Sequence, residues 1–558
     1  MKKACTTLLT MILCITLLLS LTACGGDKPA ESTPDSGEST TTTTSGEAGG
    51  DTTTTSGEDV GGDTTAEVTG STTEGGNGTT TAKPTPGKTS KTSATTKYVP
   101  PADESGYTAP PSYKTIKTDA GTVIPKIDTV KGKTLRLLCV HYAQFEDGGT
   151  ANQYMKKYYG IQVKETMATQ ETMKDEIAKS ILSDKPFDLV ASDTQIFPEL
   201  VAQGVMEPVD NCIDYSTPAM AKLKTAYEAH AFHGKHYTIP WVVGASAVLF
   251  YNIEMFEDAY LDLDGDGKKG DTPYSMYEKG TWTFDNFLKA AKEMTVTDKT
   301  GKVMTYGLAS RAWTDHQLMY LTGESIVKES GGKLVSNLDS SNFQRIYNDY
   351  VSLILDSKVV SRGGDADTYG VFDKGSAAML LAPSHCASGN YFSKIWKSQN
   401  VGIAPMPKDS KSSTYYVPGT AVSFYILLGG FEAKDSGKVN RDLLNAFIHA
   451  TLASENEKSN PDSEAYKKTR DEFVAKWSKE NKKFTNAWYD EWSEIQRSIG
   501  VSGGKVTPYV DPYNASMDVN GAILEKMLGL TCPAPITFSA AVNEAVGVLN
   551  TVLATVND

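Results

Sequence analysis

The stretches TLRLLCV (residues 134–140), IQVKET (161–166) and FDLVAS (187–192) decide the fold predicted for this chain. The first and third are mostly apolar, as is typical of strands buried on both faces, and the second alternates apolar and polar residues. The segment between the second and third has apolar residues at helical spacing, namely Met173, Ile177 and Ile181. Strands that alternate with helices predict a parallel sheet, so the sequence indicates an α/β fold.

The loops that follow these strands are candidate binding segments. In open α/β sheets, ligands bind beyond the carboxyl ends of the strands. Gln144 follows the first strand at a short distance, and Asp193 directly follows the third. Both side chains can form hydrogen bonds with a polar ligand, so we expect them near a binding site.

The first 23 residues have the features of a secretory signal peptide. Lys2 and Lys3 precede an apolar run, Leu8 to Leu21, that is too short for a comfortable membrane span. The sequence LTACG (21–25) resembles the bacterial lipobox, in which the Cys is acylated and becomes the mature N-terminus. Cys24 is therefore the predicted lipidation site, with palmitate-like acyl chains that hold the protein on the extracellular face of the cell membrane. The alternative is a Cys that follows a plain signal by chance.

Residues 24–115 are predicted to form the lipidated start and a disordered tether. Thr, Ser, Gly, Glu and Pro dominate this region, with runs such as TTTTT (40–44). So few apolar side chains cannot offset the conformational entropy that is lost on folding. Residues 116–558 hold the remaining apolar segments and are long enough for two lobes.

Composition argues against several protein classes. Of the seven Cys, four remain beyond the signal and the lipobox, without CxxC spacing: Cys139, Cys212, Cys386 and Cys532. We expect them to be small buried hydrophobic residues and not a disulfide framework. A net charge of -14 at pH 7 argues against nucleic-acid binding, which requires clusters of basic residues.

Six segments, in this order along the chain, resemble the family 1 extracellular solute-binding proteins, the group that includes maltose-binding protein. They are KPFDLVASD (185–193), LVAQGVMEPVDNCID (200–214), GKHYTIPWVVGASAVLFYN (234–252), GTWTFDNFLKAAKEMT (280–295), FDKGSAAML (372–380) and VGIAPMP (401–407). The resemblance implies a two-lobed, periplasmic-binding-protein-like α/β fold. In that fold, strands crossing near residues 237–252 join the lobes, and a hinge closes the cleft between them on a ligand.

The same resemblance implies a function in import. Members bind a small extracellular solute, most often a carbohydrate, and deliver it to the permease of an ABC importer. A ligand that contacts both lobes favours the closed form, which the permease can recognise. The chain has no Gly-x4-Gly-Lys-Ser/Thr phosphate loop, which fits ATP hydrolysis in another subunit. We therefore expect a monomeric, non-catalytic protein that requires no cofactor, with a sugar and a membrane permease as partners.

Aromatic and polar residues near the implied cleft are candidate sugar contacts. A sugar ring has an apolar C–H face and a rim of hydroxyls, so aromatic rings and a few polar groups recognise it. Trp241 lies in the crossing segment, and Trp313 follows TYGLAS (305–310). The other candidates are Gln144, Asp193, Arg311, Asp315, His385 and Tyr416, the last with its neighbour Tyr415. An ordinary structural role is the alternative for each, and it is the expected one for Trp488 and Trp492, which are four residues apart.

The sequence DLDGDGKKGD (262–271) resembles the first half of a calcium loop. Its candidate ligands are alternating carboxylates around Gly turns: Asp262, Asp264, Asp266 and Asp271. The twelfth position, which holds a bidentate Glu in an EF-hand, is Pro273 here. The loop is either a weak structural calcium site or a solvated acidic turn.

Two other function classes remain open from the sequence. A secreted glycoside hydrolase would need two carboxylates that flank a cleft, and the 68 acidic residues cannot exclude such a pair. A surface adhesin would predict repeats or a flat aromatic face. The order of the six family-like segments favours the solute-binding protein over both.

Overall fold

The computed structural model describes residues 107–140, 149–169, 172–183, 186–192, 199–229, 231–232, 234–245, 247–426, 434–435, 438–499, 506–509 and 516–557. The signal peptide, Cys24, most of the predicted tether, Gln144 and Asp193 lie outside the described residues.

The first lobe is built on a sheet with the strand order β20-β17-β5-β3-β4, to which β8 adds by pairing with β17. Its strands are β3 (Thr134–Val140), β4 (Gln162–Ala168), β5 (Leu189–Ser192), β8 (Ile239–Ala245), β17 (Tyr415–Ile426) and β20 (Val506–Tyr509). β3 is parallel to both β4 and β5, which confirms the predicted crossovers. The connection from β3 to β4 contains α2 (Thr150–Tyr154), which continues into the short helix η2 (Met155–Tyr159). The connection from β4 to β5 contains α3 (Met173–Ile181).

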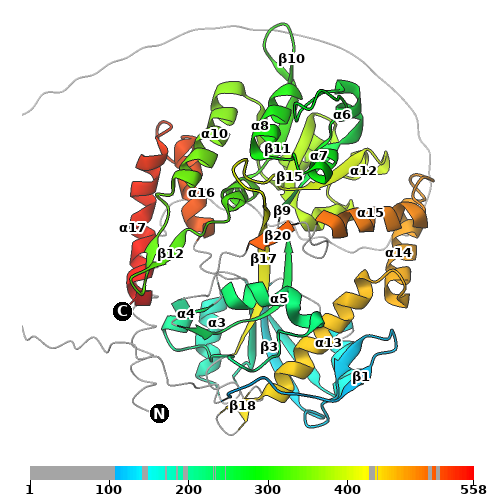
Figure 1. Cartoon of the computed structure of the whole chain (residues 1–558), viewed down its shortest axis with the longest axis vertical. Helices are drawn as coiled ribbons and strands as arrows, with labels where there is room; N and C mark the ends of the chain where they lie inside the picture. The colour runs from blue at the N-terminus through cyan, green and yellow to red at the C-terminus, as the bar shows by residue number, and fades with distance from the viewer. Residues whose placement is uncertain are drawn as a thin grey trace, which may run out of the picture. The chain divides into compact units, whose positions relative to one another are not determined.

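The second lobe is built on a sheet with the strand order β10-β11-β15-β9-β16, in which β14 pairs with β11. Its strands are β9 (Ala247–Asn252), β10 (Val296–Thr297), β11 (Val303–Ser310), β14 (Val360–Arg362), β15 (Ala377–Pro383) and β16 (Val401–Pro405). Every residue of β9, β15 and β16 is buried, because helices cover this sheet. Among them, α8 (Phe284–Glu293) packs on β11 and α7 (Pro273–Lys279) on β16 (Figure 1).

The chain passes from the first sheet to the second between β8 and β9, which only Ser246 separates. The two sheets, each with its own helices, establish the predicted two-lobed α/β fold. The remaining strands form short hairpins: β1 (Thr115–Lys117) with β2 (Val123–Pro125), β6 (Ala231–Phe232) with β7 (Lys235–His236), β12 (Val327–Ser330) with β13 (Lys333–Ser336), and β18 (Lys434–Asp435) with β19 (Lys438–Val439).

The remaining helices surround the two sheets. They are α4 (Glu199–Ala202), α5 (Pro218–Ala229), α6 (Ile253–Ala259), α9 (Ala312–His316), η4 (Gln317–Thr322), α10 (Ser341–Ser357), α11 (Asp365–Asp373), η5 (Ser384–Ser388), α12 (Ser393–Lys397), α13 (Arg441–Ser459), α14 (Glu464–Trp477), α15 (Asn486–Ile499), α16 (Ser516–Met527) and α17 (Phe538–Asn557). Thr283 caps the start of α8, because its side chain accepts from the Asn286 N–H. In the described part of the chain, no helix is both long enough and apolar enough to span a bilayer.

An aromatic cluster joins α14 and α15 to the second lobe. Trp396 lies fully buried among the rings of Phe473, Trp477, Phe484, Trp488 and Trp492. Trp492 is only 5% exposed, and Trp488 packs against the same core. The prediction that these two Trp residues belong to a helix core is confirmed. So is the burial of Cys139, Cys212 and Cys386, whereas Cys532 is half-buried.

The segment 107–115, here called the N-terminal strap, corrects the predicted end of the tether. Tyr107 donates a hydrogen bond from its hydroxyl to the Val439 carbonyl at 2.8 Å, and the Arg441 guanidinium lies 3.7 Å from the centre of its ring. Tyr113 donates to Asp442 Oδ1 at 2.8 Å. The side chains of its two tyrosines therefore fix the strap to β19 and to the start of α13.

Candidate ligand-binding site

In the first lobe, Trp241 occupies a β-bulge close to the carboxyl end of β5. The β8–β17 register shifts at this point, since Val422 pairs with Val242 but Ser423 pairs with Pro240. Ser423 also pairs with Ser192, the last residue of β5. Trp241 is thus the extra residue of the bulge, and its backbone is level with the end of β5. Bulges often occur beside functional sites, because they redirect a side chain. For Trp241 and Trp313 the description extends to the backbone alone.

In the second lobe, three parallel strands end at one edge of the sheet. The register pairs Ser310 at the end of β11 with Arg362 at the end of β14, and Ala309 with Leu380 in β15. Arg311 follows β11 directly, and α9 with Trp313 begins after it. Arg311, Trp313 and Arg362 therefore lie at this edge, near the carboxyl ends of the strands, where α/β proteins bind ligands.

Asp315 has a structural role that corrects its prediction as a sugar contact. Its side chain is 0% exposed. Oδ1 accepts from the Tyr350 hydroxyl at 2.6 Å, and Oδ2 accepts from Arg362 Nε at 2.7 Å. Burial raises the pKa of Asp315, while the Arg362 guanidinium and the Tyr350 hydroxyl oppose that rise. A carboxylate so enclosed positions Arg362 and cannot reach a ligand in solvent.

Arg362 is a candidate contact that sequence reasoning missed. Its side chain is 15% exposed, and no described residue accepts from its two terminal nitrogens. Asp315 holds the Nε edge, so the other edge of the guanidinium can donate to a ligand oxygen in a fixed orientation. The only signal in the sequence is Arg before a Gly pair, Gly363 and Gly364, which is too common to single out.

The two tyrosines at the start of β17 have different environments. Tyr415 is 6% exposed and meets the Tyr277 ring edge-on at 5.2 Å, so it belongs to the core. Tyr416 is half-buried, and its ring lies against Gly323 after η4. A Cβ built on Gly323 would come within 2.6 Å of that ring, and the residue has a φ of +69°, so only Gly fits there. His385, in η5 after β15, is exposed beside Tyr391.

Comparison with known protein families gives a match that extends over strands of both lobes. The sequence profile of the bacterial extracellular solute-binding proteins matches residues 142–427, about half of the chain. The chain belongs to this family. A search of curated proteins gives no match.

Solved structures of similar fold extend over most of this solute-binding protein. The cyclic α-maltosyl-1,6-maltose binding protein from Arthrobacter globiformis is 14% identical, with 75% of this chain and 98% of that chain covered and a TM-score of 0.50. The ABC substrate-binding protein from Listeria monocytogenes in complex with cycloalternan is 16% identical, with 76% and 99% covered and a TM-score of 0.49. A Thermotoga lettingae solute-binding protein bound with α-D-tagatose is 18% identical, with 76% and 100% covered and a TM-score of 0.47.

The acidic loop before α7 brings three of its four predicted ligands together. Asp262, Asp264 and Asp271 each offer an oxygen atom, and these atoms all lie within 4.8 Å of one another. The Lys279 Nζ lies 2.7 Å from Asp271 Oδ1, 3.3 Å from Asp264 Oδ2 and 3.6 Å from Asp266 Oδ2. Burial raises the pKa of Asp264, but hydrogen bonds from Thr281, Asp266 and Lys279 outweigh it and the net pKa is lowered. The donor set fits a hard cation such as calcium, with Lys279 as the group that a cation would have to displace.

Proposed function

We propose that the protein captures a small extracellular carbohydrate and delivers it to the permease of an ABC importer. The observation that carries the carbohydrate assignment is the placement of two tryptophans, one in each lobe, near the carboxyl ends of strands. Trp241 is level with the end of β5, and Trp313 follows the end of β11. Family membership supports solute capture, and the similarly folded Arthrobacter globiformis protein is named for a maltose-based sugar.

The geometry also suggests how binding is signalled. A sugar that stacks on a ring from one lobe and accepts hydrogen bonds from Arg311 and Arg362 in the other gains its full contact energy only when the lobes are close together. Ligand therefore shifts the population toward the closed form, which a permease can distinguish from the empty receptor. Delivery requires no chemical step on the sugar, and we propose that the protein is monomeric and has no catalytic activity.

A thermal-shift screen tests this function. Monosaccharides, oligosaccharides and polyols are compared with amino acids and inorganic anions at equal concentration. A ligand at 100 times its Kd stabilises the folded state by about 2.7 kcal/mol, which is a clear shift in melting temperature. The proposal expects at least one carbohydrate, and no member of the other classes, to produce such a shift. An oligosaccharide that is shortened during the incubation would favour the glycoside hydrolase instead.

We propose that Cys24 carries the acyl chains that hold the protein at the membrane. Changing Cys24→Ala is expected to move the protein from the membrane fraction to the medium, since the two-chain anchor is lost. Carbohydrate binding should not change, because the candidate contacts lie far along the chain in the folded lobes. Fractionation and binding assays on both forms measure the two effects. A Cys24→Ala protein that still carries acyl chains would contradict the assignment.

We also propose that the acidic loop binds calcium weakly and for structural purposes. The missing twelfth-position carboxylate predicts a Kd of about 10⁻⁴ to 10⁻³ M, as in extracellular modules. Saturating calcium should raise the melting temperature modestly, and a chelator should reverse the effect. Lys279→Met should enlarge the calcium effect, because the competing ammonium is gone. Calcium stabilisation that persists in the Asp264→Asn, Asp266→Asn double variant would place the ion elsewhere.

A further inference from the structure

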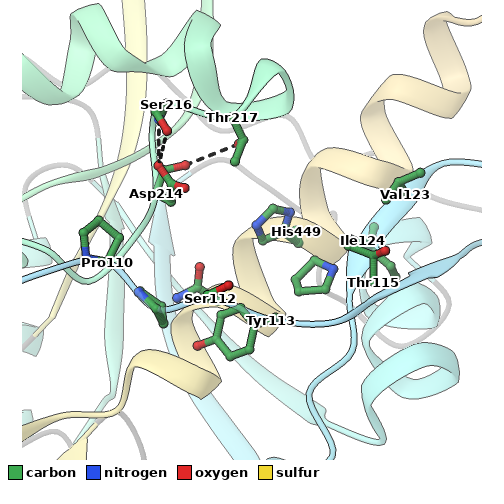
Figure 2. A pocket seen from close by; sticks show the side chains of 13 residues that line it. Pro110, Ser112, Tyr113, Thr115, Val123, Ile124, Asp214, Ser216, Thr217 and His449 are labelled. Atoms are coloured by element: carbon green, nitrogen blue, oxygen red, sulfur yellow. Dashed lines mark hydrogen bonds between the residues drawn. The ribbon is translucent and has the colours of Figure 1, made fainter.

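A separate cavity of about 850 Å³ lies in the first lobe. Four elements line it: the N-terminal strap, the β1–β2 hairpin, the loop that precedes α5, and α13 (Figure 2). None of the candidate sugar contacts whose side chains the structure describes is among its lining residues. The cavity therefore requires an explanation of its own.

The walls of this cavity are held in place by hydrogen bonds. On the strap side, Arg441 Nη1 donates to the Ala109 carbonyl at 2.7 Å, and the Tyr113 hydroxyl is held by Asp442. On the opposite side, Asp214 Oδ1 accepts from both the backbone N–H and the hydroxyl of Ser216, at 3.0 and 2.6 Å (Figure 2). The cavity is thus formed before any ligand arrives, which lowers the entropic cost of binding.

Two oxygen atoms in the cavity have lone pairs without a donor among the residues that the structure describes. Asp214 Oδ2 receives no hydrogen bond from any described residue, since both bonds from Ser216 go to Oδ1. Asn445 is only 2% exposed, and its Nδ2 donates hydrogen bonds to the carbonyls of Cys212 and Arg441, both at 2.8 Å. No described residue donates to Asn445 Oδ1. Both oxygens are available to a ligand that carries N–H donors.

His449 adds a third group that has no protein hydrogen bond among the described residues. Its imidazole points into the cavity between Asp214 and the β1–β2 hairpin (Figure 2). Burial lowers the pKa of His449 to about 4, although the nearby Asp214 carboxylate opposes that shift. The ring is therefore neutral at pH 7 and offers one nitrogen lone pair as a further acceptor.

The charge and the shape of the cavity define the ligand class. Among the described residues that line the cavity, Asp214 is the only one that is formally charged at pH 7, and none is Lys or Arg. Five other lining residues are apolar: Pro110, Pro111, Val123, Ile124 and Pro125. Val123 is 53% exposed, so an apolar surface is open to solvent at the rim.

We propose that this cavity binds an organic cation, a primary ammonium or guanidinium group on a short alkyl chain. The cationic head donates to Asp214 Oδ2, Asn445 Oδ1 and His449, and the alkyl chain packs on the prolines and Val123. An anion would meet the Asp214 charge with no compensating cation. A free amine and a lysine side chain of another protein share this chemistry.

Calorimetric titration of the full chain at pH 7 tests the proposal, with cadaverine as the cation and 1,5-pentanediol as its neutral counterpart of similar shape. Saturable binding of cadaverine, at least tenfold tighter than that of the diol, is the expected result. A Gly-Lys-Gly peptide is the second probe. Whichever of the two cations binds more tightly identifies the source, a free amine or a lysine side chain.

Matched variants keep the test specific to the cavity. Asp214→Asn preserves the acceptor for Ser216 but removes the charge, and it should weaken cadaverine binding at least tenfold. Asp128→Asn, a control in the same lobe whose side chain is 81% exposed, should leave binding unchanged. The NMR signal of the His449 ring should shift on titration with cadaverine in the unmodified protein. Absence of cadaverine binding, equal affinity for the diol, or undiminished binding to a folded Asp214→Asn protein would each overturn the proposal.

Discussion

Changing Asp315→Ala is expected to lower the free energy of unfolding by about 3–5 kcal/mol. The Asp315 carboxylate is fully buried and is the only hydrogen-bond partner of the Arg362 guanidinium among the described residues. Its removal leaves a largely buried positive charge unpaired and the Tyr350 hydroxyl with one partner fewer, and the desolvation cost of that charge is then uncompensated. Urea unfolding of the purified protein measures the loss.

Two further variants separate this effect from a general loss of charge. Asp315→Asn retains an acceptor for Tyr350 but not the negative charge, so it should be destabilising but less so than Asp315→Ala. Asp128→Ala breaks an exposed pair with Lys126 at 3.3 Å, and it should change the free energy of unfolding by less than about 1 kcal/mol. An Asp315→Ala protein as stable as the parent would show that Arg362 reaches solvent, and the positioning role of Asp315 would be wrong.

Changing Trp241→Ala is expected to weaken carbohydrate binding by about 2 kcal/mol, roughly thirtyfold in Kd. The bulge places this residue level with the end of β5, where a flat side chain can serve as a platform for a sugar ring. Trp241→Phe should retain part of the affinity, because a smaller ring still offers a flat face. Titration calorimetry with the sugar found by the thermal-shift screen measures both variants.

A core tryptophan provides the matched control for this prediction. Trp492 lies 5% exposed in the aromatic cluster, so Trp492→Ala should cost about 3–5 kcal/mol of stability while the folded fraction binds sugar normally. If Trp241→Ala behaves like Trp492→Ala, with a lower melting temperature and normal affinity, Trp241 belongs to the core and not to the site.

Much of the fold could be predicted because its signals are local. Of the three strands at residues 134–192, two are indicated by apolar runs and the other by alternating apolar and polar residues. The pairing of β17 with β8, β5 and β20 could not be predicted in the same way. It joins segments from four distant parts of the chain, and nothing in any one of them specifies its partners.

The candidate site was harder to predict for the same reason. Asp315 is a residue type that often contacts polar ligands, but here its carboxylate pairs with Arg362, which lies 47 residues further along the chain. The strap tyrosines likewise find their partners more than 300 residues away, in β19 and at the start of α13. Polar side chains take their roles from such distant partners, whereas apolar periodicity already indicates a buried face.

Calorimetric titration of the purified protein with the screened sugar, followed by chemical analysis of the recovered sugar, tests the central claim most directly. A receptor of this kind should bind the sugar saturably, with one molecule per chain, and the sugar should be recovered unchanged after prolonged incubation. No saturable binding of any monosaccharide, oligosaccharide or polyol, or recovery of the sugar as shorter products, would contradict the assignment of this chain as a carbohydrate receptor.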